Sequence, residues 1–373
     1  MVRGASPRPI SNPKWFDDNS NVGWLRISDV TEQKGRIHHL SQRISKAGQS
    51  KTRVIIEPHL LLSIAATVGS PVINYVNTGV HDGFLIFLNP TFDKEFMFQW
   101  LLMFKPYWNK YGQPGSQVNL NSDIVGNQSI AFPTTSEQER IANFFSELDT
   151  AITLHEEKKR QLERLKSALL KKMFADKSVY PAVRFKGFSD EWEQCKLGDI
   201  SSSYSGGTPK AGTQKYYNGK IPFIRSGEIS NGFTELTITE DGLRNSAAKM
   251  VGKGDILYAL YGATSGEVSI ARINGAINQA IMAIKPFEGY DSYLLASLLQ
   301  NNKTKITEKY LQGGQGNLSA TIVKNLELKV PSSKEQKLIG ILLLRLDRSI
   351  TLYEHKLELL KRLKCSLLQN MFI

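Results

Sequence analysis

Two long segments of the chain carry apolar residues at seven-residue intervals. The first segment has this spacing at Ile141, Leu148, His155, Leu162 and Leu169, and the second has it at Ile339, Leu346, Tyr353, Leu360 and Leu367. A second seam repeats the spacing at Phe145, Ile152 and Met173, and at Leu343, Ile350 and Met371. Charged residues occupy the positions between the seams, which is typical of a coiled coil. The pattern predicts two long helices, each about 57 Å in length at about 1.5 Å per residue.

Both predicted helices follow a proline that ends a strand-like segment, Pro133 in the first copy and Pro331 in the second. The segments Thr135–Gln138 and Ser333–Gln336 have the spacing of a capping box. One such helix cannot bury both of its seams alone, so we expect the two helices to pair with each other. The alternative is two independent bundle helices. The expected interface residues are Ile141, Leu148, Ile152, Leu162, Leu169, Ile339, Leu346, Ile350, Leu360 and Leu367.

The chain also contains an internal duplication. Residues 117–174 return as residues 315–372 without a gap, and roughly two positions in five are identical. Looser similarity continues upstream, where Trp24–Val30 resembles Phe223–Ile229, Ser6–Arg8 resembles Thr208–Lys210, and Phe84–Leu88 resembles Ile281–Ile284. We therefore expect a closely repeated helical frame that holds two domains of divergent sequence.

Length and composition are consistent with this organisation. A chain of 373 residues is long enough for two domains with their own cores. With 41% hydrophobic and 22% charged residues, no membrane-spanning segment and no secretory signal, we expect a soluble cytoplasmic protein. The two cysteines are far apart, which argues against a disulfide framework. The net charge of +12 favours a polyanionic partner, although many basic proteins bind no nucleic acid.

The sequence contains no convincing catalytic or metal-binding motif. Asn12–Trp15 departs from the Asn-Pro-Pro-aromatic tetrad of adenine methyltransferases and is better explained as a turn, and no phosphate-binding loop occurs. Glu327–Lys329 resembles one end of a nuclease site, but Ser129–Ala131 stands there in the first copy, so a strand explains it better. The six histidines lack metal-ligand spacing, and His155 is better explained as a seam residue.

Order, spacing and duplication together resemble a known family over almost the entire chain. Each variable region is followed by a Pro-x-x-x-Glu-Gln segment and by a long helix that ends in Leu-x-x-x-Met-Phe. The second half carries further motifs of the pattern at Gly206–Lys210, Ile221–Arg225, Gly262–Gly266, Asn278–Ala280 and Gly313–Leu318. In these features the chain resembles the specificity subunit of type I restriction-modification systems.

The resemblance implies an α+β fold with two tandem mixed-sheet target-recognition domains, separated by two long antiparallel coiled-coil helices with approximate two-fold symmetry. The expected parts are a first recognition domain at 1–132, a spacer helix at 133–175, a linker at 176–190, a second recognition domain at 191–330 and a second spacer helix at 331–373. Each domain would read one half of a split target in double-stranded DNA. Two modification subunits and the restriction subunits would bind the chain. The complex would use S-adenosylmethionine, ATP and Mg²⁺, while the chain itself would bind no cofactor and catalyse no reaction.

The first half departs from the family pattern. The stretch Phe185–Tyr204, which leads into the second Pro-containing loop, has no counterpart before the first such loop, Gly4–Arg8. About twenty residues of the pattern are absent there. Another chain that completes the first domain is one explanation, and a misplaced start or a rearranged gene are others. We expect the first domain to be the less stable of the two.

Candidate DNA contacts are polar side chains on loops, because phosphates and base edges are recognised by such groups. Residues that recur in both halves are candidates for phosphate and shape contacts, and these are Arg8 with Lys210, Arg26 with Arg225, Gln117 with Gln315, and Asn119 with Asn317. Residues that differ are candidates for base reading, and these are Lys51, Arg53, Lys215, Arg244 and Tyr261. Alternatively, Arg26 and Arg225 pair with the nearby Asp29 and Glu228, and the asparagines cap turns. A basic scaffold without sequence preference, or an enzyme with an unrecognised nuclease site, would also fit the charge.

Overall fold

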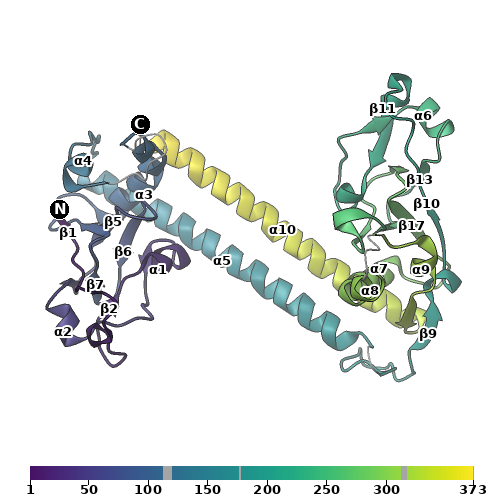
Figure 1. The fold of residues 1–373 in the computed structure, drawn as a ribbon, viewed down its shortest axis with the longest axis horizontal. Helices are drawn as coiled ribbons and strands as arrows, with labels where there is room; N and C mark the ends of the chain where they lie inside the picture. The colour runs from purple at the N-terminus through teal and green to yellow at the C-terminus, as the bar shows by residue number, and fades with distance from the viewer. Residues whose placement is uncertain (112–119, 176–177, 312–316, 373) are drawn as a thin grey trace. The chain divides into compact units, whose positions relative to one another are not determined.

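The computed structural model of the chain describes residues 1–111, 120–175, 178–311 and 317–372 (Figure 1). The chain forms two compact units. Unit 1 comprises Met1–Glu157 with His355–Ile373, and unit 2 comprises Lys158–Glu354. Each unit contains β-sheets with short helices, together with part of two long helices. No helix in the described ranges combines the length and apolarity that a membrane span requires.

Unit 1 contains two sheets that pack on each other. The larger has the strand order β1-β8-β5-β6-β3, and the smaller has the order β2-β7-β4. Their strands are β1 (Val2–Arg3), β2 (Gly23–Trp24), β3 (Arg36–Ile37), β4 (Arg53–Ile55), β5 (Leu60–Ser63), β6 (Pro71–Asn74), β7 (Thr78–Val80) and β8 (Phe84–Ile86). Side chains alternate between the faces of β5, so Leu60 and Leu62 pack against helix residues such as Met97 while Leu61 packs towards the smaller sheet. The larger sheet is therefore buried on both faces.

Short helices pack against these sheets and connect them to the long helices. They are α1 (Ile27–Glu32), α2 (Lys46–Gln49), α3 (Lys94–Phe104), α4 (Ser122–Gly126) and two 3₁₀ helices (Pro13–Trp15 and Lys105–Tyr111). The Asp93 side chain caps α3 by accepting a hydrogen bond of 2.8 Å from the backbone N–H of Phe96.

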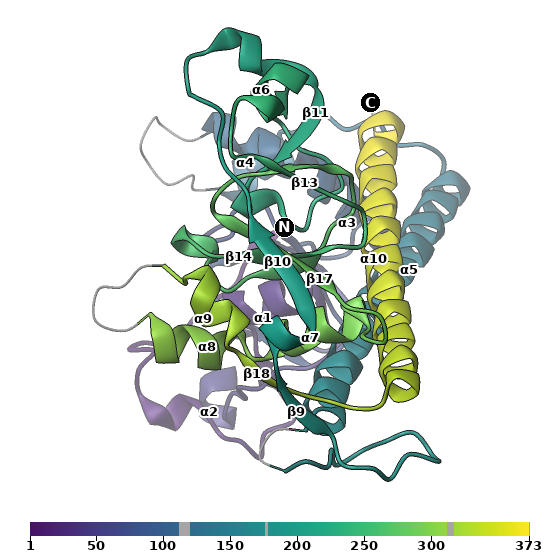
Figure 2. The ribbon, with the colours of Figure 1, turned by 90° about the vertical axis from the view of Figure 1, so that its right-hand side faces the viewer.

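Unit 2 repeats the same two-sheet arrangement. Its sheets have the orders β10-β17-β14-β15 and β12-β11-β16-β13, and a third sheet pairs β18 with β9. The strands are β9 (Glu193–Lys196), β10 (Ser201–Ser205), β11 (Tyr217–Ile224), β12 (Thr237–Ile238), β13 (Lys249–Val251), β14 (Ile256–Ala259), β15 (Val268–Ile270), β16 (Gly275–Ile277), β17 (Ile281–Pro286) and β18 (Glu327–Val330). The helices are α6 (Glu240–Arg244), α7 (Ser292–Asn301), α8 (Lys303–Tyr310), α9 (Ala320–Lys324) and 3₁₀ helices at Leu197–Asp199, Gln214–Tyr216, Ser226–Glu228 and Gly262–Thr264. As Figure 2 shows, α7 lies between the sheet that contains β17 and the long helix α10 (Ser333–Met371).

The two units share one topology, far beyond the segment of obvious sequence identity. The order β1-β8-β5-β6 corresponds to β10-β17-β14-β15, and β2-β7-β4 corresponds to β11-β16-β13. In the smaller sheets, β2–β7 and the equivalent pair β11–β16 are parallel, whereas β7–β4 and the equivalent pair β16–β13 are antiparallel. The offset between equivalent positions stays close to the 198 residues that separate Gln117 from Gln315. The duplication therefore includes both sheet-containing domains and not only the helical frame.

One sheet breaks the correspondence. In unit 2, β18 pairs with β9 and ends immediately before Pro331, as expected from the sequence. The equivalent residues of unit 1, 129–132, form no strand, so the prediction that Pro133 follows a strand is wrong. The physical reason is that a strand requires a partner for its backbone N–H and C=O groups, and no described segment of unit 1 takes the place of β9.

Two helices of 39 residues each, α5 (Thr135–Met173) and α10, extend from one unit into the other. Within each unit the beginning of one helix lies beside the end of the other, as both views show (Figures 1 and 2). The pairing that the seven-residue spacing predicted and the antiparallel orientation that the family resemblance implied are both confirmed.

Candidate nucleic-acid interface and its helical frame

A glutamine at the beginning of each long helix ties that helix to its recognition domain. The Gln138 side chain donates to the Pro133 carbonyl at 2.9 Å and accepts from the backbone N–H of Asp93 at 3.0 Å. In unit 2, Gln336 donates to the Pro331 carbonyl at 2.8 Å and accepts from Asp291 at 3.0 Å. Both glutamines are buried, and both aspartates cap the next helix, α3 or α7. The same joint is therefore built twice.

These contacts correct the capping boxes predicted from the sequence. The helices begin at Thr135 and Ser333, so both residues lie inside the first turn rather than at the N-cap. In α5 the hydroxyl of Thr134 accepts the backbone N–H of Glu137 at 3.3 Å. The glutamine side chain bonds to the N-cap of another helix instead of back to its own N-cap, because the partly buried backbone N–H of that aspartate would otherwise have no acceptor.

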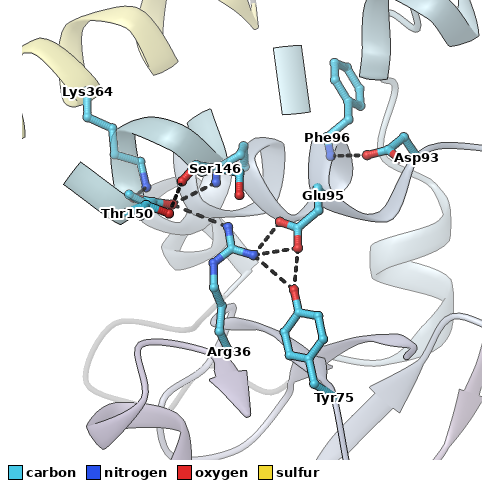
Figure 3. A network of polar contacts seen from close by, with 10 residues as sticks. Arg36, Tyr75, Asp93, Glu95, Phe96, Ser146, Thr150 and Lys364 are labelled. Carbon is cyan, nitrogen blue, oxygen red and sulfur yellow. Dashed lines mark hydrogen bonds and ion pairs between the residues drawn. The ribbon is translucent and has the colours of Figure 1, made fainter. Parts of the chain in front are cut away.

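In unit 1 a carboxylate of α5 holds the two long helices together. The Asp149 carboxylate accepts from Lys364 of α10 at 2.5 Å and from the Gln99 amide of α3 at 3.1 Å. Arg36 lies 3.4 Å from the same carboxylate and also binds Glu95, which accepts the Tyr75 hydroxyl at 2.6 Å (Figure 3). Burial and this hydrogen bond raise the pKa of Tyr75 to about 12. The network joins α3, the sheet, α5 and α10 at one point.

Unit 2 contains the equivalent carboxylate and lysine. Asp347 of α10 pairs with Lys166 of α5 at 2.6 Å, which are the positions of Asp149 and Lys364 in the other copy. The Tyr293 hydroxyl of α7 donates to Asp347. Burial is the larger cause and this hydrogen bond the second cause of a raised pKa of Tyr293. The Asp–Lys pair is therefore common to both units, while its other neighbours differ.

The predicted interface residues of unit 1 lie in one apolar cluster between the helices. It contains Ile141, Leu148 and Ile152 from α5 and Leu357 from α10, with Leu360 and Leu367 packed against it half-buried. Phe145 at its centre is fully buried and lies 6.0 Å, ring centroid to centroid, from Phe372.

In unit 2 the predicted residues are buried to different extents. Ile339 belongs to the main core together with Met173, and Leu169 packs against that core half-buried. Leu346 is buried, whereas Leu162 and Ile350 are half-buried.

The predicted DNA contacts Arg8 and Lys210 lie on equivalent loops. Each loop begins at a glycine, Gly4 or Gly206, where an added Cβ would lie about 2 Å from a backbone carbonyl oxygen, at 2.1 and 1.9 Å respectively. Only glycine permits this close approach of loop and sheet. Lys210 is exposed, and Arg8 is exposed but forms an ion pair of 2.6 Å with Asp82.

Arg26 and Arg225 occupy equivalent positions at the beginning of α1 and of the 3₁₀ helix Ser226–Glu228. Each binds the acidic residue three positions later through its backbone N–H and its guanidinium, Arg26 with Asp29 and Arg225 with Glu228. This is the intramolecular pairing that the sequence left open as an alternative. Both side chains remain a little over 40% exposed, and each guanidinium has a further partner, Ser41 at 2.6 Å for Arg26 and Glu235 at 2.9 Å for Arg225.

The candidates for base reading lie on exposed parts of the recognition domains. Lys51 is exposed two residues before β4, and Arg53, the first residue of β4, donates to the Arg3 carbonyl at 2.7 Å. Lys215 and Arg244 are exposed, in the 3₁₀ helix Gln214–Tyr216 and in the last turn of α6. The structure brings these two segments together, since the Thr239 hydroxyl that caps α6 donates to the Lys215 carbonyl at 2.7 Å.

The glycine-containing loops before α4 and α9 are described only in part. Asn317 is exposed and forms an isolated antiparallel bridge with Tyr261, whose side chain is 36% exposed. Gln117, Asn119 and Gln315 lie outside the described residues.

The similarity to known proteins occurs twice along the chain, once in each copy of the duplication. A family model described as the type I restriction modification DNA specificity domain matches residues 5–164 and again residues 189–362. The chain belongs to this family. The resemblance inferred from the repeated motifs is confirmed, as is the α+β fold with two sheet-containing domains and long helices.

Among the relatives of this DNA specificity family member are two proteins of Methanocaldococcus jannaschii. The type I restriction enzyme MjaIX specificity subunit is 29% identical over 194 residues, which cover 49% of this chain and 44% of that protein. The putative type I restriction enzyme MjaX specificity subunit is 26% identical over 261 residues, 67% of this chain and 59% of that protein. The matches thus span about half the length of these relatives.

Solved structures share the fold at low sequence identity. The type I restriction-modification system S subunit from M. genitalium superposes with a TM-score of 0.69 at 14% identity, over 100% of this chain and 93% of that one. A chain from a study of complex assembly and conformational transition of the type I R-M system gives a TM-score of 0.53 at 15% identity, over 99% and 94% of the two chains.

Sequence reasoning missed the residues that join the parts of this specificity-domain protein. Asp93 and Asp291 were not singled out, although they stand at the same offset as the repeated helices. The pairs Asp149–Lys364 and Asp347–Lys166 were visible only as repeat identities. A search for charged identities inside otherwise apolar repeat positions would have found them. The described residues contain no group of His, Cys, Asp and Glu side chains that could hold a metal ion.

We expect His81 to make the stability of the first sheet-containing domain depend on pH. Burial lowers the pKa of its imidazole below the ordinary 6.5, and nearby Asp82 opposes this only in part. Its Nδ1 accepts the backbone N–H of Gly83 at 2.9 Å, which requires the neutral ring. The unfolded chain binds a proton more readily than the folded one, so stability should fall as the pH drops below about 6.5 and level off below the folded pKa.

The expected result is a urea midpoint that decreases between about pH 7.5 and pH 5 for the native chain, and less for His81→Gln, which cannot be protonated. Asp82 lies beside His81 and also pairs with Arg8, so protonation of His81 is expected to affect the Pro-containing loop Gly4–Arg8. Identical pH profiles for the two proteins would contradict the assignment.

Proposed function

We propose that this chain is the DNA-reading, non-catalytic specificity subunit of a type I restriction-modification complex. The observation that carries the proposal is the double match to the DNA specificity domain, in which the helical frame repeats closely while the recognition domains diverge. Two different readers on one repeated frame suit a target that consists of two unlike half-sites. Each recognition domain would contact one half in the major groove, with the domains about one helical turn apart, roughly 34 Å.

Charge and exposure in the recognition domains support a contact with DNA. The net charge of +12 favours a polyanion, and exposed basic side chains occur at equivalent loops in both units, as at Arg8 and Lys210. The Arg26 and Arg225 side chains are partly exposed, while their carboxylate partners orient each guanidinium. An oriented guanidinium suits phosphate recognition, because less side-chain entropy is lost on binding.

The paired helices would set the length of the unspecified gap between the half-sites. At about 1.5 Å per residue, a helix of 39 residues is roughly 58 Å long, and its register against its partner is determined in each unit by an Asp–Lys pair and an apolar cluster. A rigid element of this kind can hold two readers at a constant separation.

The same helices offer two equivalent surfaces for partner subunits. Exposed leucines occur at repeat-equivalent positions, Leu154 with Leu352 and Leu165 with Leu363, all of them more than 45% exposed. Each unit thus contains one leucine of each equivalent pair, Leu154 and Leu363 in unit 1 and Leu165 and Leu352 in unit 2. Apolar residues exposed on a charged helix favour binding of another protein. Two modification subunits would bind there, and restriction subunits would join the complex. These partners would supply the S-adenosylmethionine, ATP and Mg²⁺ chemistry.

Comparison of adenine methylation across the genome, in cells with and without the gene, tests the proposal directly. We expect a split sequence motif whose methylation disappears with the gene. The scaffold alternative predicts no such motif, together with partner binding that is insensitive to salt. Unchanged methylation in a host that expresses functional modification subunits would contradict the proposal.

Lys210→Ala is expected to weaken binding to all DNA sequences alike and to lower the salt slope of the binding constant by about one, because one phosphate contact is lost. Lys186→Ala, which removes another exposed lysine of unit 2 outside the recognition sheets, is the matched control and should leave the slope unchanged. Fluorescence anisotropy with a labelled duplex at several salt concentrations measures both. A changed sequence preference would show that Lys210 reads a base instead.

A further inference from the structure

The beginning of α10 and the strand before it are covered in unit 2 by the segment 183–198. The Arg184 guanidinium binds Glu335 through two hydrogen bonds of 2.9 and 2.7 Å, and the Glu335 side chain is fully buried. Trp192 and Leu197 of the same segment are buried in the core, at 2% and 1% exposure. Between them, β9 pairs antiparallel with β18, with Cys195 opposite Leu328 and Glu193 opposite Val330.

The repeat-equivalent surface of unit 1 has no such cover among the described residues. Glu137, the equivalent of Glu335, is exposed and forms no ion pair with any residue of the described ranges. Phe132, the equivalent of the buried Val330, is 48% exposed, with one face stacked on Phe92 at 5.9 Å. Residues 129–132 form no strand, although their counterparts in β18 do.

We propose that this surface, defined by residues 129–132 and Glu137, is a docking site for an extended segment of another polypeptide that resembles Arg184–Leu197 of this chain. The occupant would place an arginine on Glu137, pair antiparallel with 129–132 as an added strand, and cover Phe132 with an aromatic side chain. The internal duplication supplies the argument, because the same chain shows how the equivalent surface is filled. Strand addition to an open edge is a common mode of peptide recognition, with main-chain hydrogen bonds for affinity and side-chain pockets for specificity. This proposal does not depend on the DNA-binding role.

The charge on the surface specifies the occupant further. A bidentate arginine–carboxylate contact has a geometry that lysine does not reproduce. In unit 2 the arginine also donates to the Asp190 carbonyl at 2.7 Å, so the occupant's own turn holds its guanidinium in place. A segment that carries an arginine eight residues before a tryptophan, as Arg184 and Trp192 are spaced, is therefore expected.

A labelled synthetic peptide of residues 183–198, with Cys195→Ser to prevent oxidation, tests the proposal against the full chain by fluorescence anisotropy. We expect saturable binding of one peptide per chain, weakened about tenfold or more by Glu137→Arg in the protein or by Arg184→Glu in the peptide. The two reversed partners together should recover binding. Glu139→Arg, an exposed glutamate one position beyond Gln138, is the matched control and should bind like the native chain.

The reciprocal recovery distinguishes the proposed site from displacement of the segment that already covers unit 2, because Glu137 belongs to unit 1 alone. Absence of saturable binding, or binding that Glu137→Arg leaves unchanged, would overturn the proposal. Circular dichroism of each variant verifies that the surface substitutions leave the fold intact.

Discussion

Phe145→Ala is expected to lower the free energy of unfolding of unit 1 by about 3–5 kcal/mol, the range found when a buried phenylalanine is truncated. Its side chain is fully buried, in a cluster where Ile141 and Leu148 of α5 meet Leu357 of α10. The ring lies 6.0 Å from that of Phe372, which in turn lies 5.1 Å from that of Phe96 on α3. Its loss would leave a cavity at the point where both long helices and the recognition domain touch.

The neighbouring Phe144 offers a matched control, because it is 45% exposed on the same helix. Phe144→Ala should change the free energy by less than about 1 kcal/mol. Urea unfolding followed by tryptophan fluorescence is the measurement, since four of the five tryptophans belong to unit 1. A loss below about 1 kcal/mol for Phe145→Ala would mean that the two helices do not depend on this cluster.

Asp149→Ala is expected to lower the free energy of unfolding of unit 1 by about 3 kcal/mol, since removing one partner of a largely buried charge pair leaves the other charge uncompensated. The Lys364 and Arg36 side chains beside it are only 15% and 19% exposed, so water cannot solvate them fully when the carboxylate is absent. The Gln99 amide would lose its acceptor as well.

A double-mutant cycle separates the pair from its surroundings. Asp149→Ala with Lys364→Ala should cost less than the sum of the two single changes, because the double variant leaves no unpaired lysine. Glu156→Ala is the matched control in the same unit, since its partners Lys34 and Lys361 are 60% and 56% exposed and such pairs contribute at most about 1 kcal/mol. Additive costs at Asp149 and Lys364 would show that the two side chains are not coupled.

The repetition of this pair has a consequence for the proposed spacer. Asp149–Lys364 in unit 1 and Asp347–Lys166 in unit 2 determine the same register from both halves of the duplicated helices. A heptad seam alone allows helices to slip by a whole repeat, whereas a charged pair among apolar neighbours penalises the slipped arrangement. The pairs therefore support a constant gap between half-sites in the proposed function.

Repeat-equivalent positions also show how one frame can carry two domains of different sequence. Gln138 and Gln336 make the same two hydrogen bonds, so the joint between frame and recognition domain is unchanged. The surroundings of the Asp–Lys pair differ, with Arg36 and Glu95 in one unit and Tyr293 in the other. The sheet-containing domains that this joint connects to the frame diverge in sequence.

The sequence by itself determined the duplication, the two long helices and their pairing, and its repeated motifs indicated the family. These follow from spacing along the chain, because a seven-residue apolar period and a repeat at a constant offset are local and additive signals. The helix boundaries predicted from the pattern lie within a few residues of α5 and α10.

Only the tertiary structure decided which partner each polar side chain takes. Gln138 has the spacing of a capping residue in the sequence, yet it bonds to Asp93, 45 positions away. Whether residues 129–132 form a strand likewise depended on a pairing segment from elsewhere. Hydrogen-bond partners and strand pairing are set by contacts between distant segments, which a periodic pattern does not encode.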